Sequence, residues 1–198
     1  MPRRRVKDGP GQILLDLTGR MNSAIEEPKP VIPIVGNELL LVDGANVMNA
    51  TNRGARMEIL LVLLVELKKG GAEFCCIFDA NVRFQLRKSS GIRVYEAYLK
   101  LLDTYPHQFA ESTGGLRADE LLLQRADTFK QRIITNDRFN DFKERYVWLK
   151  DENKHLVKFA VVGHELQVPS LGILAELQHT YGKLVRELIV LLGNQRST

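Results

Sequence analysis

The strongest constraint on the fold of this chain is a pattern of short apolar runs that each end at an acidic residue. The runs are Leu39–Val42 before Asp43, Phe74–Phe78 before Asp79, and Ile133–Thr135 before Asn136 and Asp137. Longer segments with helical periodicity lie between them, and this alternation is typical of a parallel sheet covered by helices. The sequence therefore predicts an α/β fold with a central, mainly parallel sheet.

The predicted elements begin after Glu38 and continue to the last leucines of the chain. The predicted helices are Arg56–Lys69, Ile92–Leu102, Ala118–Lys130, a short helix from Arg138, and Leu171–Leu192. The predicted strands are Leu39–Val42, Phe74–Phe78, a weak strand near His107–Ala110, Arg132–Thr135, and Leu156–Val162. Apolar residues in the last helix form a short heptad seam. That helix is expected to dock onto the sheet, with a homodimer through it as the second interpretation.

Composition and proline placement divide the 198 residues into three parts. Residues 1–36 are a basic, proline-containing extension, residues 37–168 the main domain, and residues 169–198 the C-terminal helical part. A hydrophobic fraction of 44% with 26% charged residues excludes wholesale disorder. The longest aliphatic run is far too short to cross a membrane, no secretory signal is visible, and the adjacent Cys75 and Cys76 exclude a disulfide framework. A soluble, cytoplasmic protein is expected.

The aspartates at the strand ends are the candidates for a catalytic centre. Ligands bind at the carboxyl ends of parallel strands, so Asp43, Asp79 and Asp137 are expected to converge. Asp119 joins them from the first turn of a predicted helix, where a carboxylate also suits the helix dipole. Each aspartate alone is also explained as a helix cap. Several carboxylates at one edge repel one another, however, and a hard cation such as Mg²⁺ or Mn²⁺ relieves that repulsion.

Two further side chains extend this acidic set. Asn46 follows Asp43 closely enough to hold a metal-bound water or an aspartate, although a lone Asn is more often a turn residue. Asp141 shares a face with Asp137 if the segment is helical, and it is then an additional or supporting ligand. The histidines form no zinc-binding pattern, and no P-loop, dinucleotide-binding glycine motif or serine-hydrolase elbow occurs.

Three motifs give this set a family resemblance. They are Val42-Asp-Gly-Ala-Asn-Val47, Ala118-Asp-Glu-Leu-Leu-Leu123, and Thr135-Asn-Asp-Arg-Phe-Asn-Asp141. Their order resembles that of NYN-type, PIN-like ribonucleases, most closely the Regnase (MCPIP) type and its bacterial relatives, over about residues 38–168. The resemblance implies a three-layer, Rossmann-like fold and a metal-dependent endoribonuclease whose site uses Asp43, Asn46, Asp119 and Asp137. Regnase proteins have two aspartates at the second motif, whereas Ala118 and Glu120 flank Asp119 here, which leaves the role of Glu120 open.

The expected reaction fits these residues. Hydrolysis of a phosphodiester needs a nucleophilic water and stabilisation of charge on the phosphoryl oxygens, and bound metal supplies both. Asp43, Asp119 and Asp137 are the expected ligands, with Asp79 and Asp141 as outer or second-metal groups. The expected products carry a 5′-phosphate and a 3′-hydroxyl, because no histidine pair for attack by the 2′-hydroxyl is visible.

Basic residues near the expected site are candidates for contacts with RNA. The stretch from Asn81 to Arg93 carries no acid and follows Asp79 directly. Single-stranded or loop RNA is the expected partner, with Phe84 or Phe139 stacking on a base. A solvated helix face is the competing interpretation for any one of these cations. The candidates are Arg53, Arg56, Arg83, Arg87, Lys88, Arg117 and Arg138.

Two other functions are compatible with the same scaffold. A structure-specific DNA nuclease or a phosphohydrolase is the first, but phosphatases of the haloacid dehalogenase type carry a second aspartate where this chain has Ala45. A non-catalytic RNA-binding module is the second, and the intact acidic set argues against it.

Overall fold

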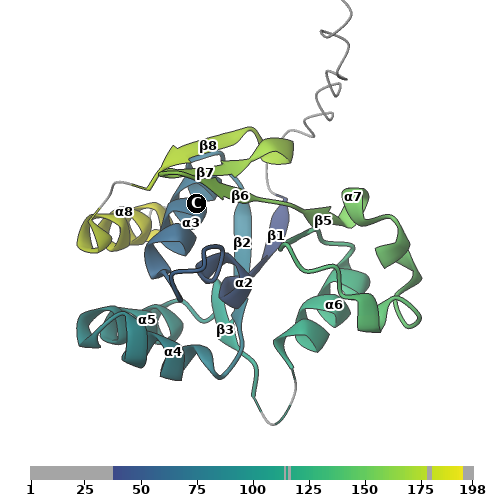
Figure 1. The fold of residues 1–198 in the computed structure, drawn as a ribbon, viewed down its shortest axis with the longest axis horizontal. Coiled ribbons are helices and arrows are strands. Elements are labelled where there is room, and N and C mark those ends of the chain that lie inside the picture. The colour runs from purple at the N-terminus through teal and green to yellow at the C-terminus, as the bar shows by residue number, and fades with distance from the viewer. Residues whose placement is uncertain (1–37, 114, 116, 178–179, 194–198) are drawn as a thin grey trace, which may run out of the picture. The chain divides into compact units, whose positions relative to one another are not determined.

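A parallel sheet of five strands forms the centre of the fold (Figure 1). The computed structural model describes residues 38–193, except residues 114, 116, 178 and 179. The strand order is β3-β2-β1-β4-β5, and every neighbouring pair is parallel. The strands are β1 (Leu39–Asp43), β2 (Glu73–Phe78), β3 (Phe109–Glu111), β4 (Ile133–Ile134) and β5 (Leu156–Val157). The predicted α/β fold is confirmed, while the predicted extension over residues 1–36 lies outside the described part.

Helices cover both faces of this sheet (Figure 1). On one face, Leu40 and Val42 of β1 join a core with α3 (Met57–Lys69) and α8 (Tyr181–Gly193), and on the other, Leu41 joins a core with α6 (Ala118–Phe129). Side chains of a strand alternate between faces, so a strand buried on both sides reads as one continuous apolar run. The helices are α2 (Gly44–Met48), α3 (Met57–Lys69), α4 (Val82–Ser89), α5 (Ile92–Thr104), α6 (Ala118–Phe129), α7 (Glu152–His155) and α8 (Tyr181–Gly193).

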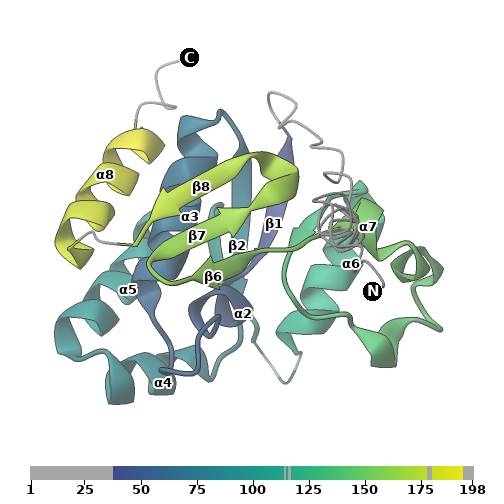
Figure 2. The same cartoon turned by 45° about the horizontal axis from the view of Figure 1, so that its top comes forward.

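The chain after β5 differs from its prediction. Instead of one strand to Val162 and a helix from Leu171, it forms an antiparallel sheet of β6 (Ala160–Val162), β7 (Glu165–Val168) and β8 (Ile173–Glu176). Gly163 and Gly172 adopt left-handed φ angles of 61° and 67° between these strands, a backbone conformation that glycine tolerates best. Leu166 and Val168 are buried against the core that contains α3, and Figure 2 shows the small sheet crossing that helix.

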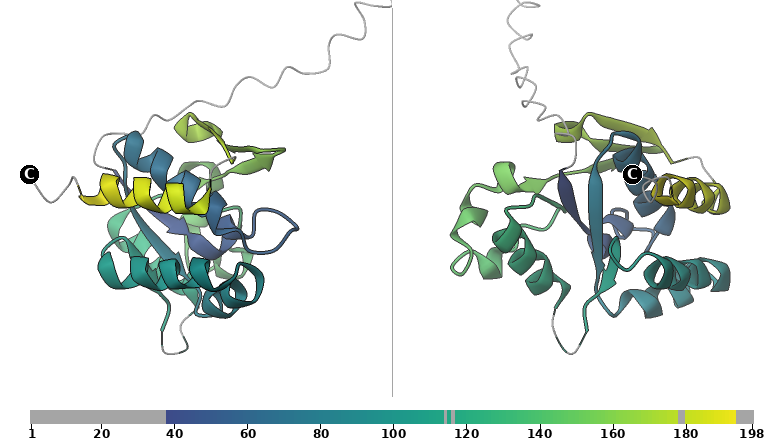
Figure 3. Two further views of the ribbon diagram at one scale, coloured as in Figure 1. Left: turned by 90° about the vertical axis from the view of Figure 1, so that its left-hand side faces the viewer. Right: turned by 180° about the vertical axis from the view of Figure 1, so that it is seen from behind.

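Helix α8 packs along α3 (Figure 3). Its buried residues Leu184, Leu188 and Leu192 share a core with that helix. The Nζ atom of Lys69 on α3 lies 2.9 Å from carboxylate oxygens of both Glu66 and Glu187, which ties the two helices together. The heptad seam predicted within the Leu171–Leu192 helix runs from Leu174 to Leu191, and it is wrong at its start because Leu174 lies on β8 and is 67% exposed. A homodimer through α8 stays a prediction.

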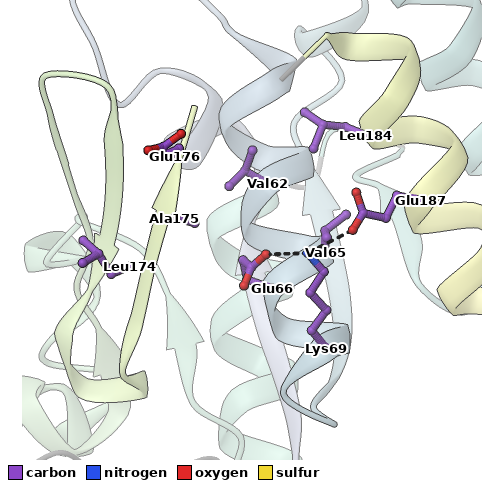
Figure 4. A pocket seen from close by; sticks show the side chains of 9 residues that line it. All are labelled: Val62, Val65, Glu66, Lys69, Leu174, Ala175, Glu176, Leu184 and Glu187. Carbon is purple, nitrogen blue, oxygen red and sulfur yellow. Dashed lines mark hydrogen bonds and ion pairs between the residues drawn. The ribbon is translucent and has the colours of Figure 1, made fainter. Parts of the chain in front are cut away.

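A shallow cavity of about 250 Å³ remains between α3, β8 and α8 (Figure 4). Apolar side chains line it together with the Lys69 bridge, so it lies within the packing of the C-terminal part. None of the described helices is both long enough and apolar enough to span a bilayer.

In the part of the chain between α2 and β5, the structure differs from two further predictions. The short helix expected from Arg138 is only a 3-10 turn at Asn140–Phe142, preceded by Phe139 with a left-handed φ of 48°. The basic stretch after Asp79 contains a helix, α4, which was not among the predicted helices. Two more 3-10 turns occur at Val147–Lys150 and Pro169–Leu171.

Gly44, the first residue of α2, packs closely against β2. A Cβ atom at this position would lie 2.5 Å from Cδ1 of Phe78 and 2.8 Å from Sγ of Cys76. We expect Gly44→Ala to lower the free energy of unfolding by about 1–3 kcal/mol through overpacking, measured by urea denaturation.

The matched control is Gly182→Ala on α8. There the nearest atom to a new Cβ is Nη1 of Arg186 at 3.8 Å, so the change should be neutral or stabilise by up to about 1 kcal/mol. Equal stability of Gly44→Ala and the unaltered chain would contradict the close packing of α2 on β2.

Candidate active site

Asp43 is the most buried acid of the candidate site, with 6% of its surface exposed. It ends β1 and caps α2, since its Oδ1 accepts the N–H of Asn46 at 3.0 Å. Its Oδ2 accepts the hydroxyl of Thr135 at 3.0 Å from the end of β4. Two elements therefore fix the orientation of this carboxylate at the carboxyl edge, the side of the sheet on which all five parallel strands end.

The environment of Asp43 raises its pKa from 3.8 to about 6. Burial is the main cause, and the two hydrogen bonds oppose it. The negative charges of Asp119 and Asp137 raise it further. Burial likewise raises the pKa of Asp119, with Arg117 opposing and the charges of Asp137 and Asp79 adding to the rise. The structure thus brings the predicted aspartates together closely enough to repel one another.

Asp137 is presented by the turn that follows β4. Its N–H donates to Oγ1 of Thr135 at 3.1 Å, and its Oδ1 accepts the N–H of Phe139 at 2.8 Å. Thr135 itself is fully buried, so one hydroxyl contacts the side chain of Asp43 and the backbone of Asp137. Phe139 is 3% exposed and belongs to the core, which removes it as a platform for a base.

Asp119 lies in the first turn of α6, where it pairs with Arg117. The distance from Nη2 of Arg117 to Oδ2 of Asp119 is 2.8 Å, and the guanidinium lies 5.6 Å from the ring centre of Phe142. Asp141 joins Asp119 and Asp137 in the lining of a depression of about 190 Å³. Asp141 reaches this place from a 3-10 turn, so the helical spacing that suggested it does not apply.

Asn46 and Asp79 are both engaged with nearby backbone. Oδ1 of Asn46 accepts the N–H of Asn136 at 2.9 Å. Asn136 in turn donates to the carbonyl of Phe159 at 2.9 Å and accepts its N–H at 3.2 Å. Asn46 therefore supports the loops after β4 and β5. Oδ1 of Asp79 accepts the N–H of Asn81 at 2.9 Å, just after β2.

The acids fit a hard divalent cation by their chemistry. Their donors are all oxygen atoms, and of Asp43, Asp119 and Asp137 only Asp119 has an ion pair within the described residues. In the part of the chain that the structure describes, no group of three His, Cys, Asp or Glu side chains is close enough to enclose a metal ion. The carboxylates thus share one edge without forming a closed set of ligands.

The predicted RNA-contacting cations fall into two groups. Arg83 binds both carboxylate oxygens of Glu111, with Nε at 2.8 and 2.7 Å, and Tyr98 donates to the same carboxylate at 2.5 Å. Arg56 pairs with Glu58. Arg53, Arg87 and Lys88 are exposed, and none of them forms an ion pair with another described residue. The guanidinium of Arg83 is thus already paired with an acid of the protein itself.

Lys158 is a residue at this edge that the sequence did not suggest. It is the first residue after β5, and its Nζ donates to the carbonyl oxygen of Asp137 at 2.8 Å. Burial lowers its pKa, while the charges of Glu152 and Asp137 oppose that fall. A strand predicted to end at Val157 would have placed Lys158 at the carboxyl edge. Thr135 and Asn136 carried no comparable signal, because both were assigned to the strand and its turn.

The comparison with protein families decides where this chain belongs. Residues 36–172 match the family described as the Zc3h12a-like ribonuclease NYN domain. The chain belongs to this family. The resemblance expected from the three motifs is confirmed, and with it the assignment of the chain to the NYN and PIN-like nucleases.

Solved structures show the fold of this NYN domain in other proteins. Nuclear protein-only RNase P 2 (PRORP2) of Arabidopsis thaliana is 18% identical, with a TM-score of 0.50 over 72% of this chain and 32% of that one. A second structure of PRORP2 gives 17% identity and a TM-score of 0.50, over 71% of this chain and 31% of that one. This chain thus spans about a third of PRORP2, and at such identity the likeness concerns the fold alone.

More distant comparisons add little. The PIN-domain endonuclease Utp24 is 19% identical with a TM-score of 0.33, over 67% of this chain and 92% of that one, a likeness too weak to support an argument. A search of curated proteins gives no match.

The raised pKa of Asp43 predicts how stability of the NYN domain depends on pH. Its native pKa of about 6 exceeds 3.8, so the folded chain holds this proton more tightly than the unfolded chain. This carboxylate therefore destabilises the metal-free fold progressively as pH rises from about 4 to about 6, by up to about 3 kcal/mol above that range. Asp43→Asn should be the more stable protein at about pH 8 in EDTA, and this advantage should vanish at about pH 4.

Urea denaturation of both proteins at the two pH values measures this difference. Asp103→Asn is the matched control, because it removes the same charge from an exposed position on α5. A constant difference between Asp43→Asn and the unaltered chain at both pH values would show that Asp43 is not destabilised by its surroundings.

Proposed function

We propose that this chain is a divalent-metal-dependent endoribonuclease that hydrolyses phosphodiester bonds in single-stranded or loop RNA. The observation that supports this best is the meeting of Asp43, Asp119 and Asp137 at the carboxyl edge, in a chain that belongs to a ribonuclease NYN family. Open parallel sheets bind their ligands at this edge, so the acids stand where a substrate would approach.

In this proposal, Asp43, Asp119 and Asp137 hold Mg²⁺ or Mn²⁺, with Asp79 and Asp141 as outer groups. When bound, such a cation supplies a nucleophilic water and stabilises charge on the phosphoryl oxygens. Thr135 keeps Asp43 oriented toward the edge through its 3.0 Å hydrogen bond. Asn46 steadies the turn that carries Asp137 by accepting the N–H of Asn136, so its role is one of positioning.

Arg117 is the cation best placed to meet a phosphate beside the acids. Its side chain is 61% exposed although it contacts Asp119 and the ring of Phe142. On the other side of the sheet, α4 offers Arg87 and Lys88, and Phe84 is 74% exposed on the same helix. An exposed aromatic ring between cations suits a single strand, whose bases are free to stack.

Cleavage should depend on metal and on Asp137. The protein is incubated with single-stranded RNA, hairpin RNA or DNA of matched sequence, in the presence of Mg²⁺, Mn²⁺ or EDTA. Internal cleavage is followed on gels. We expect RNA to be cut in preference to DNA, and EDTA to abolish the reaction. Asp137→Asn should lower turnover by more than about 100-fold, because a ligand is lost without a change in size.

Asp103→Asn controls for the loss of charge and should cleave normally. The melting temperature of each protein, with and without Mg²⁺, separates a folding defect from a catalytic one. Undiminished cleavage in EDTA would refute metal dependence, and normal cleavage by Asp137→Asn would remove that residue from the site.

The chemistry of the product ends tests the mechanism independently. Hydrolysis by a metal-activated water should leave a 5′-phosphate and a 3′-hydroxyl. The downstream product should therefore accept a 5′ label from polynucleotide kinase only after phosphatase treatment, and the upstream product should be a substrate for ligation at its 3′ end. A 2′,3′-cyclic phosphate would indicate attack by the 2′-hydroxyl instead.

A further inference from the structure

Three cations gather beside the acidic edge on the side of β5. We propose that Lys158, Lys143 and Arg138, here called the β5-side cluster, bind backbone phosphates of the RNA strand that flank the cleaved one. This inference rests on the proposed function, and it adds the side of the sheet along which the strand passes.

The position of Lys158 is the first argument. β4 and β5 pair in parallel, with Ile134 opposite Val157, so the residues after them emerge at the same edge. Neighbouring strands lie about 4.8 Å apart, which places Lys158 one strand from the turn that carries Asp137. The 2.8 Å hydrogen bond from its Nζ to the Asp137 carbonyl fixes the ammonium beside this acid rather than on its carboxylate.

The charge balance of the cluster is the second argument. Glu152 accepts from Nζ of Lys143 at 2.6 Å and lies 3.9 Å from Nε of Arg138. Lys158 has no ion pair with any described residue, although Glu152 and Asp137 are the acids whose charges reach it. Among the described residues, Glu152 therefore pairs with two of these cations, Lys143 and Arg138, and leaves Lys158 without an ion pair. Like charges held this close repel one another, and a polyanion that binds across them relieves the repulsion.

On the opposite side of the sheet, acids of the protein hold two of the cations, while Arg53, Arg87 and Lys88 form no ion pair with a described residue. There Glu111 neutralises Arg83, and Glu58 neutralises Arg56. Figure 1 shows β5 and α7 on the far side of β1 from α4, so the β5-side cluster and the cations of α4 define two separate routes for the strand. Of these two groups of cations, and within the described residues, the β5-side cluster alone has a member hydrogen-bonded to the turn that carries Asp137.

Binding of RNA without cleavage tests the inference. The full chain is titrated with a fluorescently labelled single-stranded RNA in EDTA at several NaCl concentrations, and anisotropy gives the dissociation constant. The test variant is Lys143→Gln with Lys158→Gln, in which the amide at 158 can still donate to the carbonyl of Asp137. Loss of two phosphate contacts should weaken binding and flatten the logarithmic salt slope by about 1.4.

Three matched variants identify the cause of any change. Lys143→Arg with Lys158→Arg keeps both charges and should retain the salt slope. Lys100→Gln with Lys183→Gln removes two charges from exposed positions on α5 and α8, and it should leave binding almost unchanged. Arg87→Gln with Lys88→Gln tests the route along α4 and should affect binding less than the test variant.

The outcomes separate this inference from the proposed function. If the unaltered chain cleaves RNA while the test variant keeps its affinity and salt slope, the β5-side cluster does not bind the strand and the proposed function stands. A larger effect of the Arg87 and Lys88 changes, or an equal effect of the Lys100 and Lys183 changes, also overturns the inference. If the unaltered chain neither binds nor cleaves RNA, both proposals fail.

Discussion

A single buried hydroxyl joins the two strands that carry the proposed catalytic acids. Thr135 donates to Asp43 at the end of β1 and accepts the N–H of Asp137 after β4. Because β1 and β4 are neighbours, this contact couples the orientation of the side chains to the register of the sheet. A shift by one residue would turn Thr135 to the other face and leave Asp43 buried without one of its donors. The acidic edge therefore depends on correct assembly of the sheet rather than on any one loop.

The same edge combines repulsion and attraction in a way that suits a polyanion. The negative charge of Asp137 raises the pKa values of Asp43 and Asp119, and these carboxylates would repel a phosphate that approached them alone. Two cations stand beside them: Arg117 pairs with Asp119, and Lys158 donates to the backbone carbonyl of Asp137. A strand held by such flanking charges would bring one phosphate to the acids, where the proposed metal ion would make its approach favourable.

Much of this arrangement could be predicted from the sequence because it follows from single strands. β1 and β2 are continuous apolar runs that end at Asp43 and Asp79, and parallel pairing brings such ends together whatever their separation in sequence. Contacts between side chains that are far apart in the sequence produce no such pattern in it. The pairing of Arg83 with Glu111 depends on how α4 lies against β3, and the leucine spacing that predicted one long helix is divided between β8 and α8. Lys158 was missed because its strand ends earlier than its apolar residues suggest.

The packing around α3 has a consequence for the limits of the folding unit. This helix is apolar on nearly every side, and its outer surface is covered by β7, β8 and α8. The match to the NYN family ends at residue 172, before β8 and α8 begin. A fragment cut at that point would keep every proposed catalytic acid but would expose the leucine-rich side of α3 to water, a surface prone to self-association. The segment that matches the family is thus shorter than the segment needed to bury the apolar surface of α3.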